Sequence, residues 1–266
     1  MWTREQLKTS AQDVLRRNYW MPFLASLLYN LMLSFLGSSD SVTPTFSVNI
    51  PVNSGSAETT ITPEAIERME ELFGAVDWAK VLPAIALGGF ALFLFVTLVI
   101  VLSLALNFLV TGPLAVGYSR YYIVNRERDA RLEELFAGFK KGYLNVAKGQ
   151  FMTTLLIELW TLLFIVPGII YSYKWFHVSR ILAENPTLTG KRAREISEAM
   201  TDGEKWEMFV LGLSFLGWTF LGALCCGVGL MFVEPYIQAT MAELYAVQRR
   251  RVLDAGLATP EELPGV

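Results

Sequence analysis

The chain has 266 residues, of which 53% are hydrophobic and 18% are charged, whereas soluble domains carry about 25% charged residues. The formal net charge of −3 gives no indication of a nucleic-acid partner. The single histidine and the adjacent cysteines Cys225 and Cys226 cannot supply a histidine-based or cysteine-based metal site, and no glycine-rich nucleotide-binding or hydrolase motif occurs. We therefore expect no cofactor and no enzymatic activity.

Four apolar stretches dominate the hydropathy pattern, at 19–37, 81–111, 151–171 and 208–233. A helix needs roughly 20 apolar residues to cross the hydrocarbon core of a bilayer, and each stretch provides about that number. Glu158 is the single charged residue in these stretches. The pattern predicts an all-α integral membrane protein with a polytopic helical bundle.

Residues 1–18 are predicted to form an amphipathic helix that lies on the membrane surface before span 1 at 19–37. Its start has the pattern of a capping box, with Thr3 and Gln6 three residues apart. Its apolar residues share one helical face: Leu7, Ala11, Val14 and Leu15. Similar segments at 126–145 and 187–205 precede later apolar stretches, so we expect three interfacial helices.

Residues 38–80 are predicted to form an extracytoplasmic loop before span 2 at 81–117. The first part of this loop is rich in Ser, Thr and Asn and contains Pro44 and Pro51, which indicates turns rather than a long helix. The loop is too small for an independent catalytic domain. It is a candidate contact surface for an extracytoplasmic protein partner.

Glycine and proline divide the last two apolar stretches. Pro167-Gly168 lies near the middle of 150–184, and Gly227 lies within 208–247, so each stretch predicts a helical hairpin that contributes two spans. Six spans in three hairpins place 20 of the 22 Lys and Arg residues in the cytoplasm, together with both termini and a tail at 248–266. This distribution is the one that the positive-inside rule requires.

The leg at 169–184 fits this scheme least well, because it carries Lys174, His177 and Arg180. Charged groups inside a membrane are costly, so a re-entrant or interfacial helix is the alternative for this leg.

Ionisable and polar residues within the apolar stretches are candidates for a functional site. An antiparallel hairpin about Gly168 would bring Glu158 to the level of His177 and Lys174, as a proton relay, a substrate contact or a buried structural pair. Asn107 and Glu234 are the further polar candidates, and Asn107 is expected to form hydrogen bonds between helices. Pairs and triplets of cations are candidate contacts for anionic lipid headgroups: Arg16, Arg17, Lys140, Lys141, Arg249, Arg250 and Arg251.

Several segments along the chain together carry a family resemblance. They are Arg4-Glu5-Gln6-Leu7-Lys8 through Asn18-Tyr19-Trp20, Leu135-Phe136-Ala137-Gly138-Phe139 with Tyr143, Trp160 to Tyr173, Ile181 to Pro186, Ser197 to Trp218, and Pro235-Tyr236. These segments resemble a bacterial family of integral membrane proteins known as domain of unknown function 975. The resemblance covers nearly the whole chain except the loop at 38–80, and it implies a location in the bacterial cytoplasmic membrane. It brings no activity, cofactor or catalytic residue.

Two functions remain open from the sequence. The first is a non-enzymatic protein that organises lipids or binds membrane partners, as the basic surface helices and short hairpins suggest. The second is a small-solute or ion transporter that uses the Glu158 and His177 region.

Overall fold

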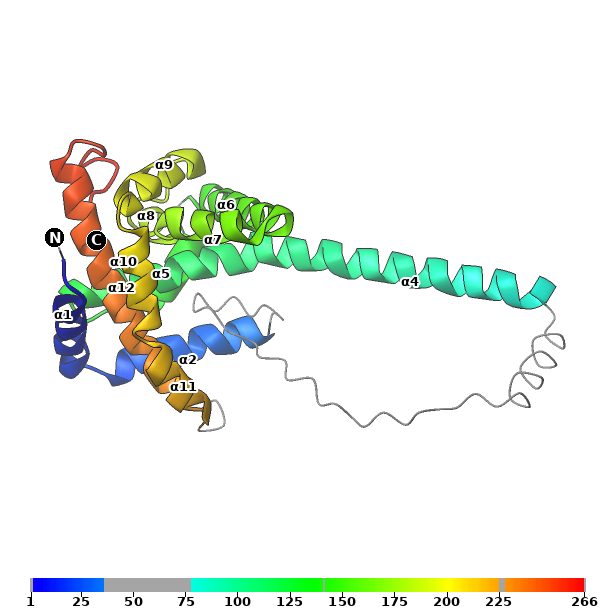
Figure 1. Ribbon diagram of the computed structural model, residues 1–266, viewed down its shortest axis with the longest axis horizontal. Coiled ribbons are helices and arrows are strands. Elements are labelled where there is room, and N and C mark those ends of the chain that lie inside the picture. Colours follow the sequence, from blue (N-terminus) through cyan, green and yellow to red (C-terminus); the bar gives the residue numbers. More distant parts are fainter. Residues whose placement is uncertain (1, 36–77, 141, 225–227, 266) are drawn as a thin grey trace. The chain divides into compact units, whose positions relative to one another are not determined.

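The computed structural model describes residues 2–35, 78–140, 142–224 and 228–265 (Figure 1). Every regular element within these ranges is a helix, which confirms the all-α prediction. The chain divides into two compact units, Met1–Ser39 with Ala105–Val266 and Asp40–Leu104. Most of the loop predicted at 38–80 lies outside the described residues.

The described part of the second unit belongs to α4 (Trp78–Leu106), which is apolar on all sides and contains Pro83 in its first turns. Two helical stretches are long and apolar enough to cross a membrane, judged by length and composition alone: Ala86–Glu127 and Lys205–Leu224. The helix at Trp20–Ser34 is apolar but shorter. The predicted six-span bundle is therefore not confirmed.

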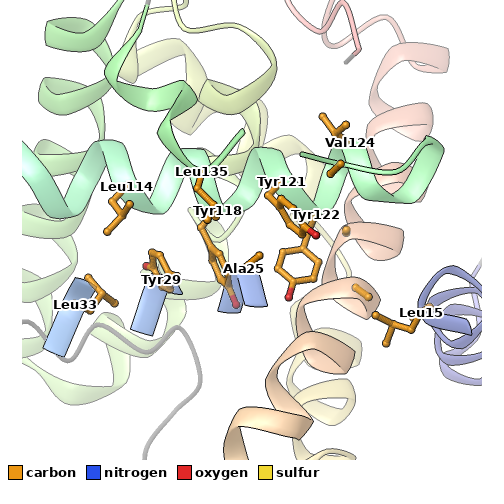
Figure 2. Packing of buried hydrophobic residues seen from close by; sticks show 14 residues of the cluster. Leu15, Ala25, Tyr29, Leu33, Leu114, Tyr118, Tyr121, Tyr122, Val124 and Leu135 are labelled. Atoms are coloured by element: carbon orange, nitrogen blue, oxygen red, sulfur yellow. The ribbon is translucent and has the colours of Figure 1, made fainter. Parts of the chain in front are cut away.

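Three helices form the centre of the first unit: α2 (Trp20–Phe35), α5 (Gly112–Glu127) and α12 (Val228–Asp254). Figure 2 shows their buried side chains, where the ring of Tyr29 from α2 stacks on Tyr118 from α5 with 4.0 Å between ring centroids. Against α5 packs a 3-10 helix, η2 (Leu132–Phe139), whose Leu135 is fully buried.

Glycine permits this close packing of α5 and η2. A Cβ atom built on Gly117 would lie 1.8 Å from the carbonyl oxygen of Leu135, and one on Gly138 would lie 2.0 Å from that of Pro113. No side chain fits at either position without a shift of the backbone.

The segments predicted to lie on the membrane surface pack on protein instead. In α1 (Arg4–Arg17) the predicted capping box forms, but the apolar residues Leu7, Ala11 and Leu15 are buried and the helix packs on α12. In η2 Leu135 is buried whereas Phe136 is 39% exposed, and the apolar face of α9 (Gly190–Thr201) is buried inside the first unit. The interfacial location of 1–18, 126–145 and 187–205 stays a prediction, and neighbouring helices cover much of the apolar faces that lipid was expected to cover.

The first hairpin consists of α6 (Tyr143–Leu163) and α7 (Ile165–Lys174). The chain turns at Phe164, whose backbone is extended (φ −151°), and not at Pro167-Gly168 as predicted. Pro167 instead lies in the first turn of α7, where the missing N–H is not needed. A Cβ atom on Gly168 would lie 2.2 Å from Thr161 Oγ1, so this glycine serves the packing of the two legs.

The leg predicted as one span at 169–184 is divided between α7 and a separate helix, α8 (Val178–Glu184). Val178, Ile181 and Leu182 of α8 are buried in a cluster with residues of α5, α9 and α12. This leg is therefore not a continuous helix, and its second half belongs to the protein core.

The second hairpin is formed by α10 (Lys205–Leu213) and α11 (Leu216–Leu224) with the start of α12. The backbones of α11 and α12 touch, since a Cβ atom on Gly229 would lie 2.6 Å from the Cα atom of Gly222. The turn predicted at Gly227 lies outside the described residues.

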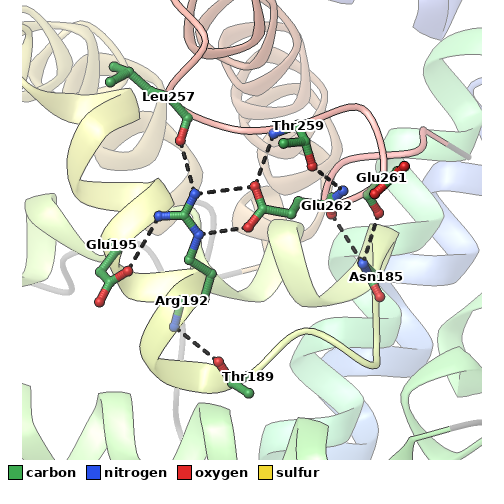
Figure 3. Close-up of polar contacts among 8 residues, drawn as sticks. All are labelled: Asn185, Thr189, Arg192, Glu195, Leu257, Thr259, Glu261 and Glu262. Atoms are coloured by element: carbon green, nitrogen blue, oxygen red, sulfur yellow. Dashed lines mark hydrogen bonds and ion pairs between the residues drawn. The ribbon is translucent and has the colours of Figure 1, made fainter.

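The segment after α12 turns at Gly256 (φ +67°) and folds back onto α8 and α9. Ala258 and Leu263 are buried there, and the Asn185 side-chain amide donates to the carbonyl oxygens of Glu261 and Glu262, each over 3.3 Å. Figure 3 shows the Arg192 guanidinium bound by the Glu262 carboxylate, with Nε to Oε1 at 2.7 Å. The predicted tail at 248–266 is thus largely helix and packed polypeptide.

Candidate functional site

The most unusual surface of the first unit is the apolar end of the α6–α7 hairpin. Its side chains extend from both legs and from the turn, and Leu162 is 86% exposed. The other exposed apolar residues there are Leu159, Leu163, Phe164, Ile165, Val166, Ile169 and Ile170.

The second hairpin has a similar exposed surface, formed by Leu216, Trp218, Phe220, Leu221, Leu224, Leu230, Met231 and Phe232. Soluble monomers rarely expose contiguous apolar patches beyond a few hundred Å², so both hairpin ends indicate contact with an apolar environment.

The polar site predicted around Glu158 is not assembled. Glu158 is exposed on α6 and has no hydrogen bond or ion pair, as far as the described part of the chain shows. Lys174 forms an ion pair with Glu198 of α9 instead. The reason is the position of the turn, which stacks Trp160 on Tyr171 and leaves His177 well beyond the level of Glu158.

His177 is fully buried and belongs to a chain of hydrogen bonds. The Gln248 amide donates to Glu204 Oε2 over 2.6 Å, so its oxygen faces His177 Nε2, also at 2.6 Å. Because an amide oxygen only accepts, Nε2 of the imidazole must carry the proton. Burial and the nearby Arg180 charge lower the pKa of His177 well below its usual range, which favours this neutral ring.

Glu204 is the centre of that network. Its carboxylate accepts hydrogen bonds from the Trp2 indole (Nε1 to Oε2, 2.8 Å) and from Arg251 as well as from Gln248. The network thus joins the N-terminus, α10 and α12. It offers no nucleophile, so His177 has a structural role in this arrangement.

Glu234 lies in a second cluster of polar side chains, between α2, α5 and α12. Its Oε1 accepts from Tyr118 Oη at 3.3 Å and from Gln238 Nε2 at 2.9 Å. Ser26 of α2 lies within hydrogen-bond distance of Tyr118 Oη (3.0 Å) and Tyr122 Oη (2.6 Å). The partners of Glu234 are neutral and connect helices. Asn107 begins a π-helix, η1 (Asn107–Thr111), and its side chain lies outside the described residues.

Several cations predicted to contact headgroups serve the fold. Arg249 pairs with Glu184 at 3.0 Å, Arg251 binds Glu204, and Arg17 donates to the carbonyl oxygen of Arg126 at 3.0 Å. Arg249 and Arg251 pair with carboxylates of the protein, whereas Arg17 is exposed; headgroup contact by these cations stays a prediction. Three of the remaining candidates are exposed, namely Arg16, Lys140 and Arg250, and Lys141 lies outside the described residues. Arg16 lies 3.8 Å from Asp13.

A crevice of about 390 Å³ lies between α5, η2, α6 and α8, with Arg120, Lys140, Glu134 and Glu184 among its lining residues. Arg120 pairs with Glu134 at 2.9 Å and donates to the carbonyl oxygen of Ala183 at 2.6 Å. Among the described residues no group of three His, Cys, Asp or Glu side chains is placed to hold a metal ion. Two of the four crevice charges thus pair with each other, and Glu184 pairs with Arg249 outside the crevice.

The model of the family described as protein of unknown function (DUF975) matches residues 1–251. The chain belongs to this family. No curated protein and no solved structure matches the chain. The family match covers the helices α1, α2 and α4–α11 and most of α12, whereas the segment that folds back onto α8 and α9 follows the matched region.

Proposed function

We propose that this family member is a non-enzymatic integral membrane protein of the cell membrane, multi-pass, that organises lipids or partner proteins, with both termini in the cytoplasm. The observation that carries the proposal is the apolar, exposed end of the α6–α7 hairpin. Leu, Ile, Val and Phe side chains so exposed are stable in hydrocarbon and unfavourable in water.

The length of the hairpin supports a re-entrant insertion. At 1.5 Å per residue, the 10 residues of α7 extend about 15 Å, which is half of the roughly 30 Å hydrocarbon core. A hairpin of this depth enters the membrane and returns to the same side. Lys174 at its end, and the buried polar network beyond it, then lie on the cytoplasmic side together with α8 and α9.

The buried polar groups favour an organising role over transport. Glu158 and His177, on which the transporter alternative depends, are held apart by the turn at Phe164. His177, Gln248 and Glu204 bind one another and fix the positions of helices. We therefore do not retain transport as a second candidate.

The proposal is tested with the double variant Leu162→Asp, Ile165→Asp at the hairpin end. Each aspartate costs about 2.5–3.5 kcal/mol at the middle of a membrane and less near its surface, whereas exposed sites in soluble proteins tolerate such changes within about 0.5 kcal/mol. We expect the wild-type chain to stay with membranes through alkaline carbonate washing and the double variant to be lost or degraded.

Leu257→Asp is the matched control, because Leu257 is 53% exposed but belongs to the segment that follows α12. The control should behave as the wild type does. Release of the wild-type chain by carbonate would refute the proposal. A double variant as abundant as the wild type would refute the insertion of this hairpin, because other apolar helices could keep such a chain in the membrane.

A further inference from the structure

Three cations without carboxylate partners surround the base of the α6–α7 hairpin, where α6 crosses α9. They are Lys148 of α6 and Lys191 and Arg194 of α9, and we name them the basic collar. Lys148 and Lys191 are exposed and Arg194 is half-buried; none of the three forms an ion pair, as the described ranges show.

The crossing of the two helices brings the basic collar together. A Cβ atom on Gly190 would lie 2.5 Å from the Cα atom of Gly149, so the two backbones touch. Lys148 and Lys191 are the chain neighbours of these glycines. The Arg194 guanidinium reaches across the crossing and donates to Thr153 Oγ1 of α6 at 3.3 Å.

Neighbouring cations differ from the collar in being neutralised. Lys174 pairs with Glu198, and Arg192 pairs with Glu262 and Glu195. The two glutamates of α9 nearest to the collar are therefore already engaged. The collar retains its positive charge.

An apolar stripe begins directly at Lys148 and follows α6 toward the hairpin end. Its residues recur at intervals of three and four, which places them on one face of the helix with Lys148. They are Met152 (41% exposed), Leu155 (40%), Leu159 (60%) and Leu162 (86%). Charge at one end of an apolar stripe is complementary to a lipid, whose phosphate adjoins its acyl chains.

Aromatic side chains extend from the collar toward the turn of the hairpin. Arg194 lies over the ring of Trp175 at 5.8 Å, and Trp175 and Trp160 both pack on Tyr171 with 4.9 Å between ring centroids. Trp and Tyr are enriched where the headgroups of a bilayer meet its hydrocarbon.

We infer that the basic collar binds the headgroups of anionic phospholipids, whose acyl chains lie against the stripe of α6. The inference rests on the proposed membrane function and names the lipid class and the residues. The collar consists of residues other than the cation pairs that the sequence singles out. A cation near an anionic membrane surface contributes about fivefold to binding, which corresponds to about 1 kcal/mol.

The experiment uses the full chain purified in a neutral detergent. Its melting temperature is followed while phosphatidylglycerol or phosphatidylcholine is added to the micelles. The collar variant is Lys148→Gln, Lys191→Gln, Arg194→Gln. The matched control, Arg4→Gln, Arg128→Gln, Arg131→Gln, removes the same charge from exposed arginines that form no ion pair in the described structure.

We expect phosphatidylglycerol, and not phosphatidylcholine, to raise the melting temperature of the wild type. The collar variant should need roughly 100-fold more phosphatidylglycerol for half the effect, and the control variant should titrate as the wild type does. Lys148→Gln alone, an exposed substitution that leaves the fold intact, should give about a fivefold change.

An unchanged titration of the collar variant would overturn the inference, and so would an equal loss in the control variant. Stabilisation by inorganic phosphate alone would also overturn it, since the collar would then bind a free anion. The collar variant should still resist carbonate extraction. If the protein resists carbonate extraction but shows no preference for phosphatidylglycerol, only lipid binding by the collar is refuted. Extraction of the wild type by carbonate refutes the proposed function itself.

Discussion

The contact between α5 and η2 gives the sharpest prediction, because it depends on a single missing atom. In Gly117→Ala the new Cβ atom would lie 1.8 Å from the Leu135 carbonyl oxygen, whereas real Cβ atoms essentially never come within 3.0 Å of another group. Two backbones must separate, and overpacking of this kind costs about 1–3 kcal/mol or more, against which alanine recovers about 1 kcal/mol of helix propensity. Because the clash involves rigid backbone atoms, we place the cost at or above the upper end of that range, which leaves a net loss of about 2 kcal/mol or more.

The assay is thermal unfolding in detergent, followed by circular dichroism at 222 nm. A loss of this size lowers the melting temperature by roughly 5–10 °C in a domain of about 200 residues. Gly212→Ala in α10 is the matched control, since nothing lies within 4 Å of its Cβ position. It should leave stability unchanged or increase it by up to about 1 kcal/mol. A Gly117→Ala chain as stable as the control would show that α5 and η2 do not pack as described.

Three further predictions concern polar contacts of the first unit. The Arg192 guanidinium lowers the pKa of the Glu262 carboxyl. This pair therefore stabilises the fold fully above the unfolded-state pKa of about 4.3 and progressively less as the pH falls through the lower folded-state pKa. Glu262→Gln should reduce the melting temperature at pH 7 by an amount that corresponds to less than about 1 kcal/mol, given the partial exposure of the pair, and the difference should shrink as the pH falls below about 4.3. A constant difference at every pH would contradict this. Glu204→Gln weakens three hydrogen bonds to a mostly buried carboxylate and should lower the free energy of unfolding by about 1.5–3 kcal/mol. The control Glu207→Gln, at an exposed site of the same helix, should lower it by under about 0.5 kcal/mol. Equal melting temperatures of the two variants would refute this prediction. Deletion of the residues after Asp254 should accelerate amide hydrogen exchange in α8 and α9 and leave that of α2 unchanged. Equal exchange rates of α8 and α9 in the truncated and the full-length chain would show that this segment does not stabilise them.

Local sequence signals predicted helix ends well. The pairing of Thr3 with Gln6 predicted the capping box of α1. These contacts join residues three apart, so the sequence contains everything that determines them.

The sequence could not predict whether lipid or another helix covers each amphipathic face. Leu7, Ala11 and Leu15 give the same pattern whether lipid or α12 covers them. The turn of the first hairpin was misplaced for a similar reason, since Pro167 is compatible with a turn and with the first turn of a helix. No residue near Phe164 indicates that the chain turns there and not at Pro167-Gly168.

The ion-pair partners of the charged residues could not be predicted either, because they depend on tertiary structure. Lys174 lies 24 residues from Glu198, and Arg251 lies 47 from Glu204. The sequence placed Glu158 opposite His177 only through an assumed turn. A shift of a few residues in the register of a helical hairpin changes which residues face each other across it. The ion pairs therefore depend on the fold and not on sequence spacing.

The segment that folds back after α12 has a consequence for synthesis of the protein. Glu184 of α8 receives hydrogen bonds from Arg249 and from the backbone N–H of Gly265, and Arg192 of α9 pairs with Glu262. During translation α8 and α9 leave the ribosome long before these partners exist. The polar groups of α8 and α9 therefore stay hydrated until the last residues are made, and the folding of α8 and α9 is completed only when those residues have left the ribosome.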